Sequence, residues 1–410
     1  MPIANTENFL PVIMGTGLNA YNLARSIHLA YGVPSLALGR YALRETADSR
    51  IVTVRTVPNF DTAEGAIETL LQVAEEHPDQ KLLLIPTIEF YTNAVLEHRE
   101  QIAAKYQIPL VAKALADKLM NKTDFYATCA ALGIPHPTTV TFGAEEPLTA
   151  LANNLSFAYP VILKPSNTDI YPRINFEGRQ KVYLVQDSAE LVRIAEKIFA
   201  AGYDDDLVVQ EYLAGDESVM RVANTYSDKN GQMKFLSIGQ VILTEYNPSL
   251  VGNNNAIVTI DDPELGESIR RLVEGVGYTG AANFDIMLDQ KTGVSKILEI
   301  NLRPGATAFY TMAAGGNLAS YFVEDQIFDR PLAPFTTTQE RLWLNVPYPV
   351  AAHFAPASTK PLLHKTAKHG ITHTLKYAPD LSVKRRIDIS RVDARHSLDY
   401  LKYAKQRLNK

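Results

Sequence analysis

Short apolar runs alternate with amphipathic stretches through the first part of the chain. The apolar runs are short enough for buried strands, and the stretches between them repeat apolar residues at helical spacing. We expect strands at residues 9–14, 35–39, 50–57 and 81–87, and helices at residues 20–32 and 62–77. This alternation predicts an α/β fold, and the segment resembles half of a doubly wound sheet.

Two further blocks follow along the chain. The middle block opens with a helical stretch that Gly133 and Pro135 end, and it continues in apolar runs. We expect strands there at residues 159–165, 206–213, 234–243, 281–289 and 295–300. The last block holds 14 Lys and Arg residues against 5 Asp and Glu residues. We therefore expect three domains, at residues 1–113, 114–330 and 331–410.

The composition is that of a globular protein, with 46% hydrophobic and 21% charged residues among 410. The net charge of -5 gives no indication of a nucleic-acid partner. Cys129 is the only cysteine, which excludes internal disulfides and fits a reducing compartment. We recognise no signal peptide and no apolar stretch of the ~18 residues that span a membrane, so we expect a cytoplasmic protein. The oligomeric state stays open, with a homo-oligomer among the options.

The end of the chain is basic and predicts a helix. Its apolar positions Leu398, Leu401 and Leu408 recur on one stripe. A basic surface attracts acidic molecules. A solvated surface on a small accessory domain is the alternative reading.

Two neighbouring segments, 281–289 and 294–302, predict a hairpin joined by the sequence QKTG. Apolar side chains occupy the even positions in both segments, so the odd positions share the opposite face. That face carries Asp285, Glu299, Asn301 and Arg303. A Pro-Gly turn follows directly.

Asp285 and Glu299 become near-diagonal neighbours across this hairpin. Two carboxylates this close repel one another unless a cation lies between them or one is protonated. Carboxylate and amide oxygens suit a hard ion such as Mg²⁺, which takes the rest of its ligands from water and substrate phosphates. The alternative is an exposed hairpin face that happens to be polar.

Two lysines are candidates for contacts with a nucleotide. The sequence has no G-x-x-x-x-G-K-[ST] loop, so phosphates have to be held in another way. Lys164 ends an apolar strand before Pro165, and Lys122 lies in the first turn of a predicted helix. A lysine ammonium can reach a triphosphate, although either residue taken alone is more often a solvated surface lysine.

The stretch VVQEYLAGDE, residues 208–217, runs from an apolar strand into a short linker. An extended linker can offer adenine backbone N–H and C=O partners, and an acid a few residues later can accept hydrogen bonds from ribose hydroxyls. The residues concerned are Gln210, Glu211, Tyr212, Leu213 and Glu217.

Read together, these segments resemble the ATP-grasp superfamily in their order and spacing. The run from FLPVIMGTGLNAYNLARS through FEGRQKVYLV and YTGAANFDIMLD to EINLRPG further resembles bacterial D-aspartate ligases. The resemblance implies an α/β ATP-grasp fold with an N-terminal Rossmann-like pre-ATP-grasp domain and a small basic C-terminal domain. It also implies an ATP-dependent carboxylate–amine ligase that uses ATP and Mg²⁺, with Mn²⁺ as an alternative ion.

The resemblance assigns roles residue by residue. Lys122 and Lys164 would contact the phosphates, and Arg303 would face the acyl phosphate and the attacking amine. The adenine would be bordered by Gln210, Glu211, Tyr212 and Leu213, and the ribose by Glu217. The metal ligands would be Asp285, Glu299 and Asn301. The stretch SNTDIYPRINFEGRQ has one glycine where many superfamily members have a glycine-rich lid, so no lid residue is assigned.

The N-terminal pattern G-x-G-x-x-A comprises Gly15, Gly17 and Ala20. A dinucleotide site and a tight strand-to-helix turn are the two readings, and no well-placed acid supports the first. In the context of the resemblance this helix start would border the amino-acid site.

Three functions remain open. The first is ligation of D-aspartate to the lysine side-chain amine of a peptidoglycan precursor. The second is ligation of another amino acid or of a dipeptide. The third is a non-catalytic ATP-binding regulatory module.

Overall fold

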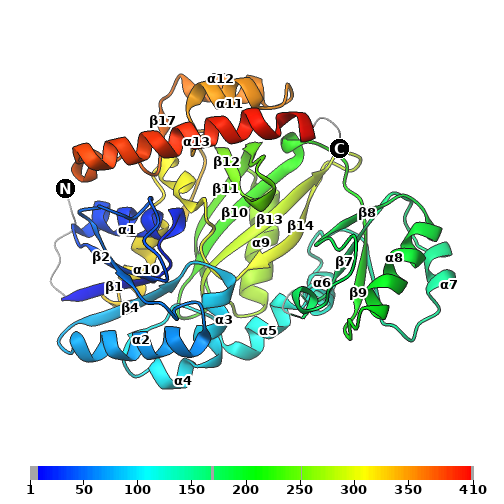
Figure 1. The fold of residues 1–410 in the computed structure, drawn as a ribbon, viewed down its shortest axis with the longest axis horizontal. Helices are drawn as coiled ribbons and strands as arrows, with labels where there is room; N and C mark the ends of the chain where they lie inside the picture. The colour runs from blue at the N-terminus through cyan, green and yellow to red at the C-terminus, as the bar shows by residue number, and fades with distance from the viewer. Residues whose placement is uncertain (1–7, 168–169, 251, 408–410) are drawn as a thin grey trace. The chain divides into compact units, whose positions relative to one another are not determined.

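The computed structural model describes residues 8–167, 170–250 and 252–407 (Figure 1). The chain forms two compact units, and both are discontinuous in sequence. Unit 1 contains Met1–Lys113, Asp216–Phe284 and Asn301–Lys410, and unit 2 contains Ala114–Gly215 and Asp285–Ile300. The expected division into three domains stays a prediction.

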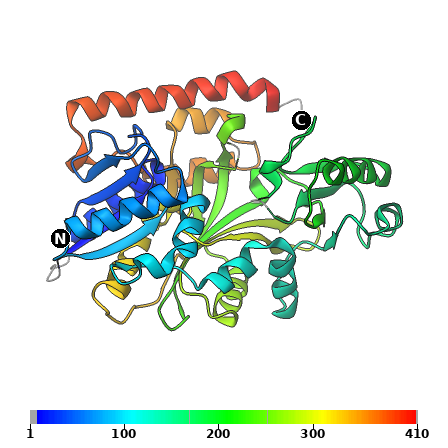
Figure 2. The ribbon, with the colours of Figure 1, turned by 60° about the horizontal axis from the view of Figure 1, so that its bottom comes forward.

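Unit 1 begins with a five-stranded parallel sheet, ordered β3-β2-β1-β4-β5 (Figure 2). Its strands are β1 (Phe9–Met14), β2 (Ser35–Gly39), β3 (Val52–Thr56), β4 (Lys81–Pro86) and β5 (Tyr106–Gln107). The helices between them are α1 (Leu18–Tyr31), α2 (Ala63–Glu76), α3 (Glu89–Glu97) and α4 (Arg99–Ile102). Side chains of β1 and β2 are buried almost throughout, as in a parallel sheet covered on both faces.

A second, larger sheet follows the order β14-β13-β10-β11-β12-β16-β17, and β15 pairs with β11. The strands are β10 (Met220–Ser227), β11 (Met233–Thr244), β12 (Asn254–Ile260), β13 (Gly280–Asp289), β14 (Val294–Asn301), β15 (Phe335–Thr336), β16 (Leu342–Leu344) and β17 (Ile371–Thr372). Strand β13 begins in unit 1 and belongs to unit 2 from Asp285 onward, and β14 belongs to unit 2 except for its last residue, Asn301. The predicted hairpin is therefore divided between the units.

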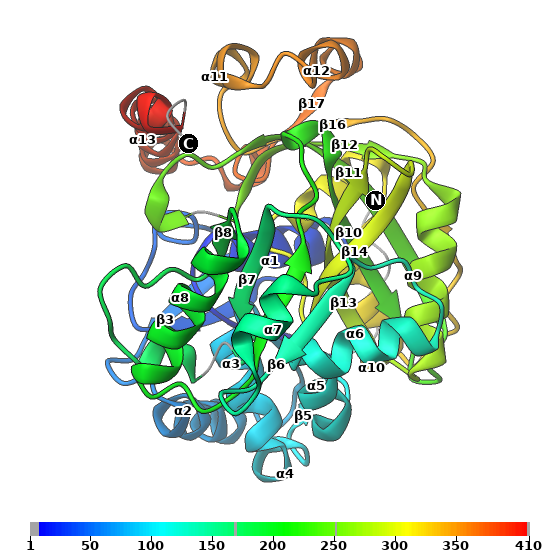
Figure 3. The ribbon, with the colours of Figure 1, turned by 90° about the vertical axis from the view of Figure 1, so that its right-hand side faces the viewer.

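The remaining helices of unit 1 cover these sheets. They are α9 (Pro263–Gly275), α10 (Leu318–Gln326), α11 (Tyr348–Phe354), α12 (Lys360–Ala367) and α13 (Val383–Arg407), with the 3₁₀ helices η2 (Glu217–Val219), η3 (Pro248–Leu250), η4 (Ala308–Ala314) and η5 (Ala378–Asp380). Figure 3 shows α11, α12 and α13 gathered at one end of the unit. Trp343 is fully buried and donates a hydrogen bond to the Thr374 hydroxyl, which gives it a structural role.

Unit 2 contains a four-stranded antiparallel sheet in the order β6-β9-β7-β8. Its strands are β6 (Thr139–Phe142), β7 (Val161–Pro165), β8 (Tyr183–Val185) and β9 (Leu207–Glu211). Its helices are α6 (Lys122–Ala131), α7 (Leu148–Asn153), α8 (Ser188–Ala200) and the 3₁₀ helix η1 (Tyr171–Arg173), while α5 (Lys113–Met120) leads into it. Leu191 and Ile194 of α8 share a core with Val161 and Leu163 of β7, so this helix covers one face of the sheet.

The C-terminal stretch is helical from Val383 onward, and Leu398 and Leu401 lie on one face of α13 as expected. Both leucines are exposed, so the stripe does not face a core. Leu408 lies outside the described residues. Within the described chain no helix combines the length and the hydropathy that crossing a bilayer requires.

Candidate active site

Unit 2 brings together three of the predicted charged residues. Lys122 is the first residue of α6, whose N-cap Asn121 accepts a hydrogen bond from the Asp124 backbone. Lys164 lies in β7, and Glu299 lies in β14. The two ammonium groups act electrostatically on the same carboxylate although they lie 42 residues apart in sequence.

Lys164 is 8% exposed and has two hydrogen bonds. Its ammonium group donates to the Tyr126 hydroxyl at 3.0 Å and to the Gln210 side-chain oxygen at 3.1 Å. Burial lowers the pKa of Lys164 to about 8, although the nearby Glu299 carboxylate works in the opposite direction. Burial also lowers the pKa of Lys122, and Glu299 again opposes the shift. The Glu299 carboxylate therefore does not fully offset the cost of burying the two ammonium charges, and the negative charge of a triphosphate would offset it further.

Glu299 is the negative centre of this cluster. Burial alone raises its pKa, but Lys122 and Lys164 outweigh burial, and the net shift of the pKa is downward. Asp285 contributes to this lowering through a side-chain hydrogen bond to Glu299. The structure therefore brings the two carboxyl groups into hydrogen-bond contact.

The alternation that predicts this face holds in part. Leu288 and Leu298 are only half-buried, and Asn283 and Asp289 of the opposite parity are buried. Phe284, Ile286, Ile300 and Leu302 are buried as expected. Ile297 has the same parity as Glu299 and is also fully buried. Its backbone N–H donates to the carbonyl of Pro135 at 2.9 Å, so a second segment lies beside this part of the strand.

The predicted adenine-bordering residues begin inside a strand. Gln210 and Glu211 belong to β9, and the side chain of Gln210 is buried against Lys164. The carboxylate of Glu211 accepts a hydrogen bond from the Thr138 backbone and pairs with Lys296. After the strand, Tyr212 is 37% exposed and Leu213 is buried. Because the side chains of Gln210 and Glu211 already have partners, the backbone N–H and C=O groups after β9 are the candidates for hydrogen bonds to adenine.

Two residues join this cluster that the sequence did not single out. The Tyr126 hydroxyl accepts from Lys164 and donates to the Leu298 carbonyl at 2.6 Å, which ties α6 to the strand that carries Glu299. Lys181 acts electrostatically on both Lys164 and Glu299. Lys181 belongs to the stretch FEGRQKVYLV. A glycine-rich segment at this place would have indicated a lid that carries such a residue, but the sequence has one glycine there.

In unit 1, Glu217 opens the 3₁₀ helix η2 and is 1% exposed. One of its carboxylate oxygens accepts a hydrogen bond from the Thr244 hydroxyl at 2.7 Å. Its backbone carbonyl accepts from the side-chain amide of Gln240 at 2.7 Å. Both partners lie on β11, so the sheet fixes the position of this carboxylate.

Asn301, the last residue of β14, and Arg303 belong to unit 1 and contact one another. The Arg303 guanidinium donates to the Asn301 side-chain oxygen at 3.5 Å and to the Pro304 carbonyl at 3.1 Å. The Asn301 amide donates to Asn283 at 3.3 Å. The guanidinium is thus held beside an amide that belongs to the predicted metal set.

The turn after Arg303 is fixed by asparagines. The Gly305 backbone N–H donates to the Asn224 side-chain oxygen at 3.0 Å, and a Cβ at this position would lie 2.8 Å from the amide nitrogen of Asn283. Asn19 on α1 donates to the Pro304 carbonyl at 3.2 Å. The start of the first helix therefore borders the Arg303 turn.

The pattern G-x-G-x-x-A forms the tight turn between β1 and α1. Gly15 has a φ of +129°, and a Cβ there would lie 2.2 Å from the Thr87 hydroxyl oxygen. Gly17 is the N-cap of α1. Gly15 is required by its backbone conformation and its close contact, which agrees with the reading as a strand-to-helix turn.

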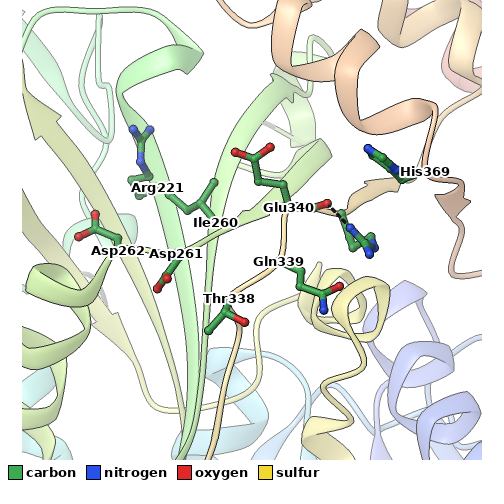
Figure 4. Close-up of a pocket in the computed structure, with 9 residues that line it drawn as sticks. Arg221, Ile260, Asp261, Asp262, Thr338, Gln339, Glu340 and His369 are labelled. Carbon is green, nitrogen blue, oxygen red and sulfur yellow. Dashed lines mark hydrogen bonds between the residues drawn. The ribbon is translucent and has the colours of Figure 1, made fainter.

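A pocket of 720 Å³ lies elsewhere in unit 1 (Figure 4). Its lining comprises Arg221, Ile260, Asp261, Asp262, Thr338, Gln339, Glu340, Arg341 and His369. Asp262 is the N-cap of α9 and accepts from the Leu265 backbone, so part of the lining has a structural role. None of the residues predicted from the sequence lines this pocket.

The donor chemistry of the predicted metal set fits a hard cation. Asp285 and Glu299 supply carboxylate oxygens that already meet, and Asn301 supplies an amide oxygen. Among the described residues no group of three or more His, Cys, Asp and Glu side chains is arranged to hold a metal ion. The predicted set has only two such side chains, and it stays a prediction.

Comparison with known proteins identifies the family. No protein-family model matches the chain. The D-aspartate ligase of Enterococcus faecium (strain Aus0004) is 33% identical over 390 residues, which cover 92% of this chain and 93% of that protein. The chain belongs to the D-aspartate ligase family. The predicted family is thereby confirmed, and with it the class of enzyme, an ATP-dependent ligase.

Solved structures show the fold of this D-aspartate ligase family member. The biotin carboxylase domain of 2-oxoglutarate carboxylase from Hydrogenobacter thermophilus, in complex with MgADP, ADP and bicarbonate, has a TM-score of 0.60 at 16% identity and covers 80% of this chain and 72% of that chain. The L-amino acid ligase from Bacillus licheniformis has a TM-score of 0.54 at 16% identity, covering 78% and 75%. The predicted α/β ATP-grasp fold is confirmed.

Proposed function

We propose that this D-aspartate ligase family member activates a carboxylate of D-aspartate with ATP and joins it to the lysine side-chain amine of a peptidoglycan precursor. ADP and phosphate are the other products. The observation that carries the proposal is the cluster of Lys122 and Lys164 around Glu299, with Asp285 in hydrogen-bond contact with that carboxylate. The precursor amine is inferred from the family resemblance alone.

The nucleotide is proposed to bind with its phosphates at Lys122 and Lys164. Lys164 is buried and Lys122 is half-buried, and burial lowers the pKa of both ammonium groups in spite of the Glu299 carboxylate, so anion binding there is favourable. The adenine would lie beside Gln210, Glu211, Tyr212 and Leu213. The ribose hydroxyls would donate to Glu217, which β11 holds in place.

Mg²⁺, or Mn²⁺ in its place, is proposed to be held by Asp285, Glu299 and Asn301. Asp285 and Glu299 share a hydrogen bond that a cation would replace. When bound, the ion offsets charge on the phosphates during transfer.

The chemistry follows from the leaving group. A carboxylate does not accept an amine directly, because oxide would have to leave. Transfer of the γ-phosphoryl group to a carboxylate oxygen breaks the bond to ADP and forms an acyl phosphate. The amine nitrogen then attacks the acyl carbon, loses a proton, and expels phosphate. Positioning and charge neutralisation supply most of the catalysis in such reactions.

Arg303 is proposed to stabilise the oxyanion that forms when the amine attacks. Its guanidinium is oriented by the Asn301 side chain and the Pro304 carbonyl. A preorganised cation adds most where charge develops in the transition state.

Product analysis tests the proposal. The chain is incubated with ATP, Mg²⁺, a lysine-containing muropeptide and D-aspartate, and in parallel with L-aspartate and other D- and L-amino acids. We expect ADP release only with D-aspartate and a product whose mass equals the sum of both substrates minus water. Turnover with other amino acids alone would assign a different ligase, and no ADP with any substrate would assign a non-catalytic module.

A further inference from the structure

The outward side of α13 carries an apolar stripe that no part of the protein covers in the described chain. Val383 is 77% exposed, Ile387 49%, Leu398 64% and Leu401 65%. At about 100° per residue these four side chains and Ala394 fall within a sector of roughly 60°. They extend over about 27 Å of helix at 1.5 Å per residue. We refer to this sector and its borders as the α13 outer face.

A basic row borders the apolar stripe on one side. It comprises Lys384, Arg391, Arg395 and Lys402, all of them exposed. The side chains of Lys384, Arg391 and Arg395 are 71%, 64% and 70% exposed. Arg386 is exposed on the opposite border. The α13 outer face thus combines apolar side chains with cations along its length.

The acidic residues of α13 lie outside the apolar sector. Asp388, Asp393 and Asp399 are turned toward the protein, with side-chain exposures of 18%, 26% and 21%. Asp393 pairs with Lys376, and Asp399 accepts a hydrogen bond from Asn247. Among the described residues the apolar sector itself contains no carboxylate. Carboxylates do meet the basic row, because Asp388 pairs with Arg391 and Asp399 with Arg395. Asp48 pairs with Lys384 in the same way.

The opposite side of α13 is anchored to unit 1. Arg385 is buried and donates to the backbone carbonyls of Ala47 and Glu45 at 2.9 and 2.8 Å. Tyr400 is buried and donates to the Thr244 carbonyl at 2.6 Å. The helix is fixed at both ends by its inner side, so the outer face is presented as a rigid surface.

We propose that the α13 outer face binds the surface of an anionic lipid bilayer. Helices that lie in a membrane interface have this arrangement, in which apolar side chains enter the headgroup boundary and Lys and Arg contact anionic headgroups. The charge distribution decides against a second copy of the chain as the occupant. In an antiparallel helix pair the basic rows would face one another, and in a parallel pair the only carboxylates near them are those that already pair with the row within the same chain.

Vesicle binding by the full chain tests this proposal. The probes are vesicles of equal parts phosphatidylglycerol and phosphatidylcholine, and vesicles of phosphatidylcholine alone. We expect co-sedimentation with the anionic vesicles that weakens as salt is added, because exposed charges are screened. The double variant L398Q/L401Q should bind them about tenfold more weakly, since two apolar anchors are lost.

Two further variants separate the two parts of the face. The triple variant R391Q/R395Q/K402Q should lose most of its preference for anionic vesicles and most of its salt dependence. Leu398→Trp should shift its fluorescence to the blue on binding, whereas Trp343, the only native tryptophan, is buried and should not respond. Leu29→Gln, at an exposed leucine of α1, is the matched control and should bind as the native chain does.

The proposal is wrong if the native chain does not bind anionic vesicles at low salt, or if L398Q/L401Q binds them equally well. Self-association that depends on Leu398 and Leu401, without vesicle binding, would assign the face to a second copy. Ligase turnover without vesicles should be the same in the native chain and in both multiple variants, so loss of binding is distinguishable from loss of the active site.

Discussion

The hydroxyl of Thr244 donates a 2.7 Å hydrogen bond to the carboxylate of Glu217. The carbonyl of the same threonine accepts a hydrogen bond from Tyr400 at 2.6 Å. Helix α13 thereby reaches, through one residue, the carboxylate that we propose for the ribose. Thr244 is a positioning residue in this arrangement.

Thr244→Val should raise the KM for ATP about tenfold and leave kcat nearly unchanged. Valine keeps the shape of threonine but removes the hydroxyl, and a hydrogen bond to a charged group is worth about 1.5–3 kcal/mol. The preference for ATP over 2′-deoxy-ATP and 3′-deoxy-ATP should fall as well. Steady-state kinetics with the three nucleotides measure both effects.

Thr69→Val is the matched control, because the Thr69 hydroxyl donates a buried 2.6 Å bond to Gly65 within α2. Its KM for ATP should not change. Equal changes in the two variants would show that Thr244 only supports the fold.

The activity of the enzyme should depend on the charge of Lys164. Burial lowers the pKa of this lysine to about 8, so the free enzyme is protonated there below pH 8 and loses the proton above it. Only the protonated form attracts phosphates, and kcat/KM reports groups of the free enzyme. We expect kcat/KM for ATP to fall as the pH rises through about 8. Lys164→Arg, which keeps its charge, should move this fall to higher pH.

Lys197→Arg on α8 provides the control, because Lys197 is exposed in the last turn of this helix and does not belong to the predicted site residues. Its pH profile should match that of the native enzyme. An alkaline fall that persists at the same pH in the Lys164 variant would exclude this lysine as its cause.

Glu299→Gln should raise the Mg²⁺ concentration needed for half-maximal turnover by at least about tenfold. The neutral amide binds a hard cation less strongly and leaves Lys122 and Lys164 without their carboxylate. Removal of Mg²⁺ by a chelator should abolish turnover, and Mn²⁺ should restore it. Asp289→Asn changes a carboxylate of β13 outside the predicted ligand set and should leave the Mg²⁺ titration unchanged.

Arg303→Ala should lower kcat by about 10²–10³, the usual cost of losing one oxyanion-stabilising group. Thermal unfolding should stay cooperative, because Arg303 lies beyond the end of β14 and is only half-buried. An unchanged kcat would remove Arg303 from the mechanism. Arg303→Lys, which keeps the charge without the fork of donors, should recover only part of the rate.

Asp380→Ala should destabilise the chain by about 3–5 kcal/mol, because it leaves Arg385 buried without its carboxylate. Asp380 is fully buried and also accepts from Tyr21, Ser49 and the Arg50 backbone. Urea unfolding measures the change.

Lys384→Ala is the comparison, since Lys384 pairs with Asp48 at the surface, where such pairs contribute about 0–1 kcal/mol. Similar losses of stability in both variants would contradict the distinction between the buried pair and the exposed pair.

The local pattern of the sequence predicts much of the fold. The expected strands at residues 9–14 and 35–39 have the bounds of β1 and β2. Side-chain alternation also places Asp285 and Glu299 on one face, where the structure brings them into contact. The spacing of apolar residues is a local property, so it predicts a strand or helix correctly where neighbouring residues determine the secondary structure.

Contacts between residues far apart in the sequence cannot be predicted from such a local pattern. Tyr126 bonds to the Leu298 carbonyl 172 residues later, and nothing near either residue indicates this. Ile297 is buried because Pro135 lies against it, and local alternation predicts the opposite. Leu398 and Leu401 form an apolar stripe, but only the folded chain shows that it faces outward.

The chain passes between the two units four times, after residues 113, 215, 284 and 300. During translation, residues 114–215 therefore leave the ribosome without the strand that carries Glu299. The cluster around Lys164 cannot be completed until residue 300 has been synthesised, almost three quarters of the way along the chain. A nascent or truncated product that ends earlier has the lysines of this cluster but not its carboxylate.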